Sequence, residues 1–310
     1  MILWTTEQYE YMRDDLLSAT GAQPGQIERK TFADGETYHR LITDVVGRDV
    51  VLVGGTGSDA QTLELFDMAC GLVQAGARAL TLVLPYLGYA TMDRAVKPGE
   101  VVKAKTRARL VSAIPHGVQA NRIVLLDLHA EGIQYYFEGG SHPVHVYAKP
   151  VVSKAIVELG GDGYVLACTD AGRAKWVESL ANELNVDASF VFKRRGADGK
   201  PAVTGINADV DGRDVVIYDD MVRSGDSLLI AAKAYRNAGA TSVSAVTTHG
   251  IFPGDAINTI QKAGLIDRMI CTDSHPGALT ASQQADGFLA MRSVVPVLAD
   301  AITGGKAATS

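Results

Sequence analysis

The feature that most constrains this sequence is a segment that occurs twice. Residues 47–53 read Gly-Arg-Asp-Val-Val-Leu-Val, and residues 212–218 read Gly-Arg-Asp-Val-Val-Ile-Tyr. Each copy contains a short, β-branched apolar run, which is typical of a buried strand. A turn, a helical stretch, Ala-Gly-Ala and a second apolar run follow each copy. Strand, helix and strand in both halves predict two tandem α/β domains, each a mainly parallel sheet flanked by helices.

The helical stretch that follows each copy has recognisable ends. In the first half Ser58 is a candidate N-cap and Gly76 a C-terminal stop. In the second half the helix is expected to run from Ser224 to Gly239. We expect the buried faces to consist of Leu63, Phe66, Ala69, Leu72 and Val73 in the first helix and of Leu228, Ile230, Ala231 and Tyr235 in the second.

Length and composition agree with two globular domains. The chain has 310 residues, against roughly 150 for a typical domain, and 47% of them are hydrophobic and 21% charged. We expect an N-terminal domain over residues 1–149 and a C-terminal domain over residues 150–310, divided where Pro150 interrupts the pattern. A closing helix over residues 294–302 is a candidate to pack back on the first domain. Further strands are expected at residues 79–84, 122–126, 163–168, 242–247 and 268–272.

Charge, cysteines and hydropathy exclude several classes of protein. Lysines and arginines number 29 against 35 acids, a net charge of −6, so no global basic field is available for nucleic-acid binding. Cys70, Cys168 and Cys271 are too widely spaced for a zinc or redox pair and fit a reducing compartment. The sequence has neither a signal-like N-terminus nor an apolar run of the ~20 residues that span a bilayer. We therefore expect a cytoplasmic protein with neither nucleic acid nor membrane as a partner.

The second copy of the repeat ends in two acids and a turn of small residues. Asp219 and Asp220 follow the apolar run, and open α/β sheets bind ligands at that edge. Paired carboxylates can accept hydrogen bonds from neighbouring hydroxyls or hold a divalent cation, while Ser224, Gly225 and Ser227 offer donors at a helix N-terminus. The pattern predicts a ligand with sugar hydroxyls and one phosphate. A solvated polar turn with an ordinary N-cap is the alternative.

Residues 219–228 resemble the phosphoribosyl-binding loop of phosphoribosyltransferases and, more closely, that of ribose-phosphate pyrophosphokinases. Further segments resemble the latter family in the same order, from about residue 30 to residue 302. These segments are 32–36 (Phe-Ala-Asp-Gly-Glu), 85–94 (Pro-Tyr-Leu-Gly-Tyr-Ala-Thr-Met-Asp-Arg), 127–134 (Asp-Leu-His-Ala-Glu-Gly-Ile-Gln), 169–173 (Thr-Asp-Ala-Gly-Arg), 193–195 (Lys-Arg-Arg) and 248–252 (Thr-His-Gly-Ile-Phe).

The resemblance implies two phosphoribosyltransferase-type domains and a ribose-phosphate diphosphokinase activity. Such an enzyme transfers the β,γ-diphosphoryl group of ATP to the C1 hydroxyl of ribose 5-phosphate, giving AMP and phosphoribosyl pyrophosphate, and it requires Mg²⁺. Because negative charge spreads over phosphate oxygens in the transition state, the protein mainly has to position the reactants and neutralise charge. The family also implies a homo-oligomer built from dimers, with a hexamer as one candidate size.

The same resemblance implies roles for individual residues. Lys193 and Arg195 are the implied catalytic residues, and His129 and Asp170 are the implied metal ligands. The implied ATP contacts are Phe32, Asp34, Glu36, Asp93, Arg94 and His129, with Phe32 and Glu36 reaching across a subunit interface. The implied ribose-phosphate contacts are Asp219, Asp220, Arg223, Ser224, Gly225, Asp226 and Ser227. Taken singly, residues 193–195 also fit a solvated basic turn, His129 a structural histidine, and Asp34-Gly35 a surface hairpin.

Several residues depart from the family pattern. Thr91 and Met92 replace an Arg-Gln pair, which removes a guanidinium from the nucleotide end. Asp226 stands where glycine is usual, and Arg223 where aspartate is common. An extra carboxylate beside a bound phosphate lowers affinity unless it points away or pairs with Arg223. The turn at residues 169–173 has lost a glycine, which brings Arg173 closer along the chain.

These departures keep two other functions open. A weakly active or inactive regulatory homologue would bind nucleotide or phosphosugar, and the loss of the guanidinium at Thr91 favours it, whereas the retained charged residues argue against it. A phosphoribosyltransferase is the second alternative, although such an enzyme needs only one copy of the fold. The six basic residues between Arg94 and Arg109 fit either a mobile phosphate-gathering loop or the exposed face of a helix.

Overall fold

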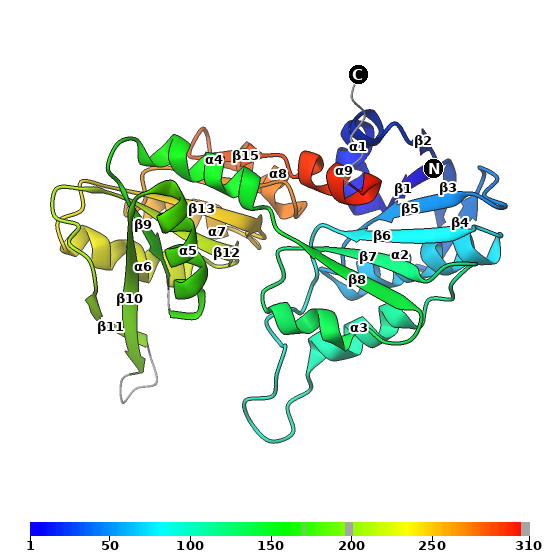
Figure 1. Cartoon of the computed structure of the whole chain (residues 1–310), viewed down its shortest axis with the longest axis horizontal. Helices are drawn as coiled ribbons and strands as arrows, with labels where there is room; N and C mark the ends of the chain where they lie inside the picture. Colours follow the sequence, from blue (N-terminus) through cyan, green and yellow to red (C-terminus); the bar gives the residue numbers. More distant parts are fainter. Residues whose placement is uncertain (170, 196–200, 305–310) are drawn as a thin grey trace. The chain divides into compact units, whose positions relative to one another are not determined.

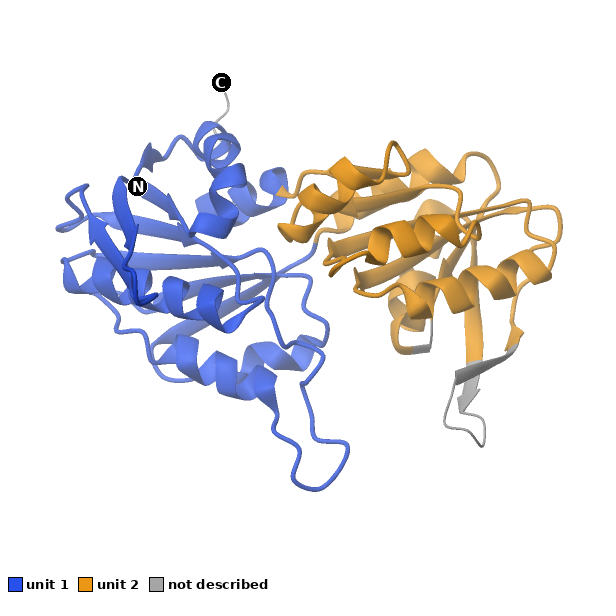
Figure 2. Cartoon of the chain, turned by 180° about the vertical axis from the view of Figure 1, so that it is seen from behind, with its two compact units in different colours: residues 1–147, 295–310 blue, residues 148–294 orange. Residues whose placement is uncertain are grey.

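The structure is a computed structural model that describes residues 1–169, 171–195 and 201–304. It divides into two compact units, which Figure 2 shows in different colours. Unit 1 consists of Met1–Tyr147 together with the segment from Val295 onward, and unit 2 is Ala148–Val294. The last helix of the chain thus belongs to the unit that begins it.

Unit 1 contains a parallel six-stranded sheet in the order β2-β1-β5-β6-β7-β8 and a separate antiparallel hairpin of β3 and β4. Its elements are β1 (Ile2–Thr5), a 3₁₀ helix (Glu7–Met12), α1 (Arg13–Thr20), β2 (Gln23–Pro24), β3 (Ile27–Thr31), β4 (Thr37–Leu41), β5 (Asp49–Val53), α2 (Asp59–Gln74), β6 (Ala79–Leu84), α3 (Lys103–Ser112), β7 (Asn121–Leu126), a second 3₁₀ helix (Glu131–Tyr136), β8 (Ser141–Val146) and α9 (Val295–Thr303).

Helices cover both faces of the sheet in unit 1, with α2 and α3 on one side and α1 and α9 on the other (Figure 1). The alternation of side chains along each strand supplies an apolar surface to both layers. Helix α9 buries Leu298 and Ile302, and Arg122 of β7 donates to the backbone oxygen of Ala301 at 2.6 Å. These contacts attach the C-terminal helix to unit 1.

Unit 2 contains a seven-stranded sheet in the order β11-β10-β9-β12-β13-β14-β15, in which only the β10–β11 pair is antiparallel. Its elements are α4 (Lys149–Gly160), β9 (Val165–Cys168), a 3₁₀ turn (Ala171–Arg173), α5 (Ala174–Leu184), β10 (Asp187–Arg195), β11 (Pro201–Ile206), β12 (Asp214–Val222), α6 (Asp226–Asn237), β13 (Ser242–Gly250), α7 (Ala256–Lys262), β14 (Met269–Thr272), α8 (Gly277–Gln284) and β15 (Leu289–Arg292).

The core of unit 2 also has two layers. Helices α6, α7 and α8 pack on the face that includes Val215 and Ile217 of β12. The opposite face includes Tyr218, whose ring stacks on Trp176 of α5 with the centroids 4.2 Å apart. Successive residues of β12 therefore face different helical layers, which matters for the two acids at its end.

The repeat prediction is confirmed, because both copies form central strands of parallel sheets, β5 and β12. Ser58 is confirmed as the N-cap of α2, since its side chain accepts a hydrogen bond from the backbone N–H of Gln61 at 3.2 Å. The predicted buried face of α2 is partly wrong, because Leu63 is 53% exposed while Leu65 and Met68 are buried. The residues of α2 that are buried depend on how the helix is rotated about its axis against the sheet. Sequence spacing alone placed this buried face one or two residues away from its observed position.

Helix α6 begins at Asp226, with Gly225 as its N-cap, two residues after the expected start near Ser224. Pro150 does not interrupt an element, because it lies in the first turn of α4, where its missing N–H costs no hydrogen bond. Among the described residues, no helix is both long enough and apolar enough to cross a bilayer.

Candidate functional site

The acidic pair lies on β12 itself, which continues to Val222 rather than ending at residue 218. On one side β9 stops at Cys168, opposite Tyr218, while on the other side β13 stays paired with β12 to its end. Asp219 and Asp220 therefore lie on β12 just beyond the end of one neighbouring strand. Asp219 is half-buried, and Asp220 is only 3% exposed.

The two carboxylates have different partners. One oxygen of Asp219 accepts from the Thr169 hydroxyl at 2.9 Å and the other from the backbone N–H of Asp220 at 3.0 Å. Asp220 instead receives a guanidinium, since Arg173 Nε lies 3.1 Å from its Oδ1 and Nη2 lies 2.6 Å from its Oδ2. Asp219 thus has neutral donors in these contacts, whereas Asp220 forms a bidentate ion pair.

Arg173 is the part of this site that sequence reasoning missed. It stands at the N-cap position of α5, and its side chain is largely buried, at 20% exposure. Burial by itself lowers the pKa of Arg173, but the interactions with Asp220, together with attraction to Tyr218 and Asp219, outweigh burial and the pKa is raised. The signal in the sequence was the turn at residues 169–173, where a glycine of the family pattern is lost and an arginine stands closer along the chain.

The predicted phosphate loop links β12 to α6. Gly225 is buried at φ 86°, and a Cβ there would lie 2.5 Å from Ile260, so only glycine fits. Arg223, Ser224, Asp226 and Ser227 are all exposed around it. The Ser224 hydroxyl donates to the Asp226 carboxylate at 2.8 Å, so the additional carboxylate is hydrogen-bonded within the loop.

The implied catalytic residues lie on β10, next to the antiparallel strand β11. Lys193 is paired with Val203 and Arg195 with Pro201, and the register shifts between Phe192 and Lys193. The side chains of Lys193 and Arg195 are outside what the structure describes, and Asp170 lies outside the described residues altogether. The backbone places both basic residues at the far end of the β10–β11 hairpin.

The implied ATP contacts lie on three segments of unit 1. Phe32, Asp34 and Glu36 are exposed at the turn of the β3–β4 hairpin, where an oxygen of Asp34 accepts from the backbone N–H of Glu36 at 3.1 Å. The Phe32 ring is 42% exposed and lies edge-on to Tyr38, with the centroids 6.4 Å apart. The turn of this hairpin therefore presents an aromatic ring and two carboxylates on the surface.

The other ATP candidates follow β6 and β7. Asp93 is half-buried, with its backbone oxygen held by the Tyr136 hydroxyl at 2.7 Å, and Arg94 is exposed. His129 is half-buried just after β7, where Asp127 is buried at φ 40°, in the left-handed region. Such backbone is uncommon outside glycine and often accompanies a functional site.

The basic stretch after Arg94 ends in α3, whose cations have partners. Arg107 pairs with Asp59 and lies over the Tyr89 ring, with its guanidinium carbon 4.6 Å from the centroid. The Tyr89 hydroxyl donates to Asp59 at 2.6 Å, which lowers the pKa of that carboxyl, and Arg107 lowers it further. Arg109 pairs with Glu138 at 3.1 Å. From Lys103 onward the helix-face interpretation is therefore the better one.

A buried polar network lies beside the acidic pair, at the ends of β13 and β14. His249 Nδ1 is 2.8 Å from the Ser274 hydroxyl, and the Tyr218 and Thr248 hydroxyls are 3.0 Å apart. Burial lowers the pKa of His275 to about 4, and the proximity of His249 contributes. Hydroxyl and imidazole groups thus link the ends of three neighbouring strands, β12, β13 and β14.

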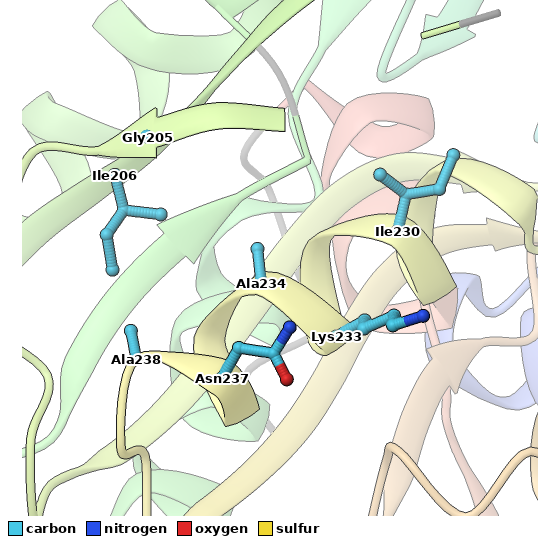
Figure 3. Close-up of a pocket in the computed structure, with 7 residues that line it drawn as sticks. All are labelled: Gly205, Ile206, Ile230, Lys233, Ala234, Asn237 and Ala238. Carbon is cyan, nitrogen blue, oxygen red and sulfur yellow. The ribbon is translucent and has the colours of Figure 1, made fainter. Parts of the chain in front are cut away.

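A pocket of about 540 Å³ lies between β11 and α6 (Figure 3). Its lining is mostly aliphatic, with Ile206, Ile230 and Ala234, and Lys233 is the charged side chain among the described lining residues. Neither acid of β12 is part of that lining. The pocket is thus distinct from the polar edge of the sheet and does not suit a phosphosugar.

Comparisons with known proteins agree with this layout. A family model described as the N-terminal domain of ribose phosphate pyrophosphokinase matches residues 1–114, and one described as a phosphoribosyl synthetase-associated domain matches residues 170–302. A ribose-phosphate pyrophosphokinase of Chromobacterium violaceum is 34% identical over 281 residues, 90% of this chain and 83% of its own length. One of Hyphomonas neptunium is 36% identical, covering 80% of this chain and 78% of its own.

The fold has a solved counterpart as well. The crystal structure of a phosphoribosylpyrophosphate synthetase from Mycobacterium smegmatis matches with a TM-score of 0.85 and 24% sequence identity, over 97% of each chain. At that identity the match supports the fold, with a tandem α/β arrangement along the whole chain.

Proposed function

This chain belongs to the ribose-phosphate pyrophosphokinase family, and we propose that it transfers the β,γ-diphosphoryl group of ATP to ribose 5-phosphate. The C1 hydroxyl oxygen attacks the β-phosphorus, and the bond from that phosphorus to the α,β-bridging oxygen breaks. AMP leaves with the bridging oxygen, and the hydroxyl proton is lost. The observation that carries this proposal is a sequence match with a ribose-phosphate pyrophosphokinase over 90% of the chain.

The ribose 5-phosphate end of the site is proposed at the junction of β12 and α6. Sugar hydroxyls would donate to the acidic pair, and the 5-phosphate would meet the backbone N–H groups and hydroxyls between Ser224 and Ser227. Helix α6 is 12 residues long, so its N-terminus carries a partial positive charge that favours an anion. Because Ser224 already donates to Asp226, a phosphate has to compete with that carboxylate.

Lys193 and Arg195 are proposed to neutralise the diphosphoryl group as it transfers. An arginine can contact two phosphate oxygens with its planar fork, whereas a lysine supplies a movable point charge. Both stand on the β10–β11 hairpin. This hairpin forms one edge of the sheet and joins the parallel strands through the pairing of β10 with β9. Arg223 is a further cation proposed for the phosphate end.

ATP is proposed to bind unit 1, with Asp93, Arg94 and His129 as contacts. Phe32 and Glu36 would face the adenine of a nucleotide on a neighbouring subunit, and Asp34 is a further proposed ATP contact. The exposure of the Phe32 ring at a hairpin turn supports this, because an aromatic ring on a projecting turn is more stable when a partner covers it. A homo-oligomer built from dimers is part of the proposal.

Mg²⁺ is the proposed cofactor, with His129 and Asp170 as its protein ligands. Among the described residues no group of three acids, histidines or cysteines is close enough to hold a metal by itself. The carboxylate of Asp170 suits Mg²⁺, because this ion usually keeps several waters and binds one or two carboxylates plus substrate phosphates. When bound, it would neutralise charge on the phosphate oxygens.

The proposed location is the cytoplasm, and the three free cysteines fit a reducing compartment. The proposed small-molecule partners are ATP and ribose 5-phosphate, with neither nucleic acid nor a membrane among them.

The proposed reaction is tested by ³¹P NMR of the purified chain with ATP, Mg²⁺ and ribose 5-phosphate. We expect AMP and a sugar-bound diphosphate to appear together in equal amounts. ADP in place of AMP would contradict diphosphoryl transfer. Binding without turnover would favour the regulatory homologue, and release of diphosphate only after a nucleobase is added to phosphoribosyl pyrophosphate would favour a phosphoribosyltransferase.

A further inference from the structure

The β3–β4 hairpin carries three of the proposed ATP contacts on its turn, and its apolar contacts with unit 1 lie at its base. The two strands pair with each other and form a sheet separate from the parallel one. Ile27 and Leu41, at the strand ends farthest from the turn, lie against the core of unit 1. Every residue of the two strands is at least partly exposed. Apolar burial therefore contributes little to the direction in which the hairpin projects.

Arg29, in the middle of β3, links the hairpin to three other elements of unit 1. Its Nη2 donates to the backbone oxygen of Thr5, at the end of β1, at 2.6 Å, and its Nη1 donates to the Glu10 carboxylate at 2.8 Å. Its Nε lies 3.4 Å from a carboxylate oxygen of Glu64 on α2. The same oxygen of Glu64 accepts from the backbone N–H of Glu7 at 2.9 Å. One side chain thus joins β3 to β1, the first 3₁₀ helix and α2.

The degree of burial makes these ion pairs stronger than a surface pair. The side chains of Arg29 and Glu64 are 23% and 14% exposed, and that of Glu10 is 38% exposed. The same hairpin has a second ion pair, between Arg40 and Glu28 at 3.2 Å, whose side chains are 62% and 51% exposed. Because water screens exposed charges, the second pair contributes little, whereas a partly buried guanidinium shared by two carboxylates contributes more.

A cavity of about 480 Å³ adjoins the base of the hairpin. Its lining includes Trp4 and Glu10 from the body of unit 1, and Ile27, Arg29 and Ile42 from the hairpin and its flank. Side chains therefore leave part of this base unfilled. A base that is incompletely packed can tilt, and the contacts of Arg29 oppose that tilt.

The turn of the hairpin follows any tilt at its base. The backbone N–H of Phe32 donates to the oxygen of Glu36 at 2.8 Å, and that of Gly35 donates to the oxygen of Phe32 at 3.0 Å, so the turn is closed on itself. Phe32 lies three residues after Arg29, which in a strand is a distance of about 10 Å. A rotation of about 10° at Arg29 would therefore move Phe32 by roughly 2 Å.

We propose that Arg29 is a positioning residue for the ATP site, which fixes the direction of the β3–β4 hairpin and thereby places Phe32 and Glu36 against the adenine. This inference rests on the proposed function, because it assumes that the turn of the hairpin contacts ATP. Arg29 itself contacts neither substrate, and its effect on the nucleotide is transmitted through the hairpin.

The test measures initial rates of the full chain with each substrate varied in turn. Arg29→Gln removes the guanidinium that Glu10 and Glu64 share, and we expect it to raise the KM for ATP by on the order of tenfold. The adenine is remote from the reacting phosphorus, so kcat and the KM for ribose 5-phosphate should change by less than about threefold. Arg29→Lys keeps the charge but loses the planar fork, so its KM for ATP should be intermediate.

Two further variants serve as controls. Arg40→Gln removes the exposed ion pair of the same hairpin and should leave the KM for ATP unchanged. Phe32→Ala removes the ring itself and should raise that KM. Combined with Arg29→Gln, it should raise the KM by less than the product of the two single effects, because both changes act through the same ring.

Hydrogen exchange separates a tilted hairpin from a misfolded unit. Arg29→Gln should speed exchange in β3 and β4 and leave β5, in the parallel sheet, protected. If β5 also loses protection, Arg29→Lys replaces Arg29→Gln in the kinetic test.

The outcomes distinguish this inference from the proposed function. An Arg29 variant with β5 protected and the wild-type KM for ATP would overturn the role of Arg29. Single effects that multiply fully in the double variant would overturn it as well, because Arg29 would then act by another route than Phe32. A wild-type KM for ATP in Phe32→Ala would remove the hairpin from the ATP site, and this inference with it. A wild-type chain without diphosphoryl transfer would overturn the proposed function.

Discussion

Asp226 lies in the proposed phosphate loop and affects both its fold and its expected ligand affinity. It occupies the first turn of α6, where an acid suits the helix N-terminus, and it accepts the Ser224 hydroxyl at 2.8 Å. Both interactions stabilise the loop. In the proposed site the same carboxylate would compete with the 5-phosphate for the Ser224 hydroxyl and add a like charge beside it, so a residue that favours the fold would work against the ligand.

We predict that Asp226→Asn lowers the KM for ribose 5-phosphate about fivefold, since removing one like charge at a solvated site is worth about 1 kcal/mol. The side-chain amide oxygen of the new asparagine can still accept the hydrogen bond from the Ser224 hydroxyl, so the loop should keep its conformation. Initial rates at saturating ATP measure the change, with Asp255→Asn at the start of α7 as the control. A KM that rises or stays the same would show that Asp226 does not repel the phosphate.

The β10–β11 hairpin is the element whose charges the proposal assigns to chemistry. Its backbone extends the sheet of unit 2 by one antiparallel pair, and the register shift between Phe192 and Lys193 interrupts the ladder just before the basic residues. Such irregularities occur often next to active sites. Lys193 is the first residue after the shift and is therefore the one to substitute first.

Lys193→Ala should lower kcat by on the order of 100-fold or more, because a cation that acts on developing charge contributes in the transition state. Ribose 5-phosphate affinity should change little, since this end of the substrate is assigned to β12 and α6. Steady-state rates and calorimetry together measure the split, with Lys262→Ala on α7 as the control. An unchanged kcat would remove Lys193 from the catalytic set.

The ends of β13 and β14 carry a pH-sensitive element. Burial lowers the pKa of His275 to about 4, so the folded state holds this imidazole neutral where the unfolded chain, near 6.5, takes up a proton. The resulting stability is complete above about pH 6.5 and is lost as the pH falls toward 4.

The free energy of unfolding of unit 2, measured with urea, should therefore fall by about 2 kcal/mol between pH 7.5 and pH 5 because of this group alone. His275→Gln should remove that part of the pH dependence, while His142→Gln, at an exposed position of β8, should not. Identical pH profiles for wild type and His275→Gln would contradict the assignment.

At the scale of the molecule, sequence predicted the pattern that repeats and missed what depends on distant contacts. The paired strand, helix and strand units were readable because apolar runs and caps such as Ser58 are local signals. Leu63 was assigned to the wrong face because only the sheet decides which side of α2 is buried. The Arg173 contact was missed because it joins residues 47 apart in sequence, and no local pattern encodes such a partner.

The division of the chain makes a prediction about stability. Leu298 on α9 is fully buried in unit 1, although unit 2 precedes it in the sequence. Leu298→Ala should destabilise unit 1 by about 3 kcal/mol and speed hydrogen exchange in β7 without affecting β12. Val157→Ala, at a 51% exposed position of α4, should change neither strand. An increase in hydrogen exchange on Leu298→Ala that is larger in β12 than in β7 would contradict the assignment of α9 to unit 1.

The central claim is that the C1 hydroxyl of ribose 5-phosphate attacks the β-phosphorus of ATP. Ribose 5-phosphate labelled with ¹⁸O at that hydroxyl tests it directly, because the isotope shifts the ³¹P signal of the phosphorus to which it is bound. The account predicts the label in the bond between C1 and the diphosphate of the product, with unlabelled AMP. Label in AMP or in water, or a sugar diphosphate that has lost it, would contradict the account.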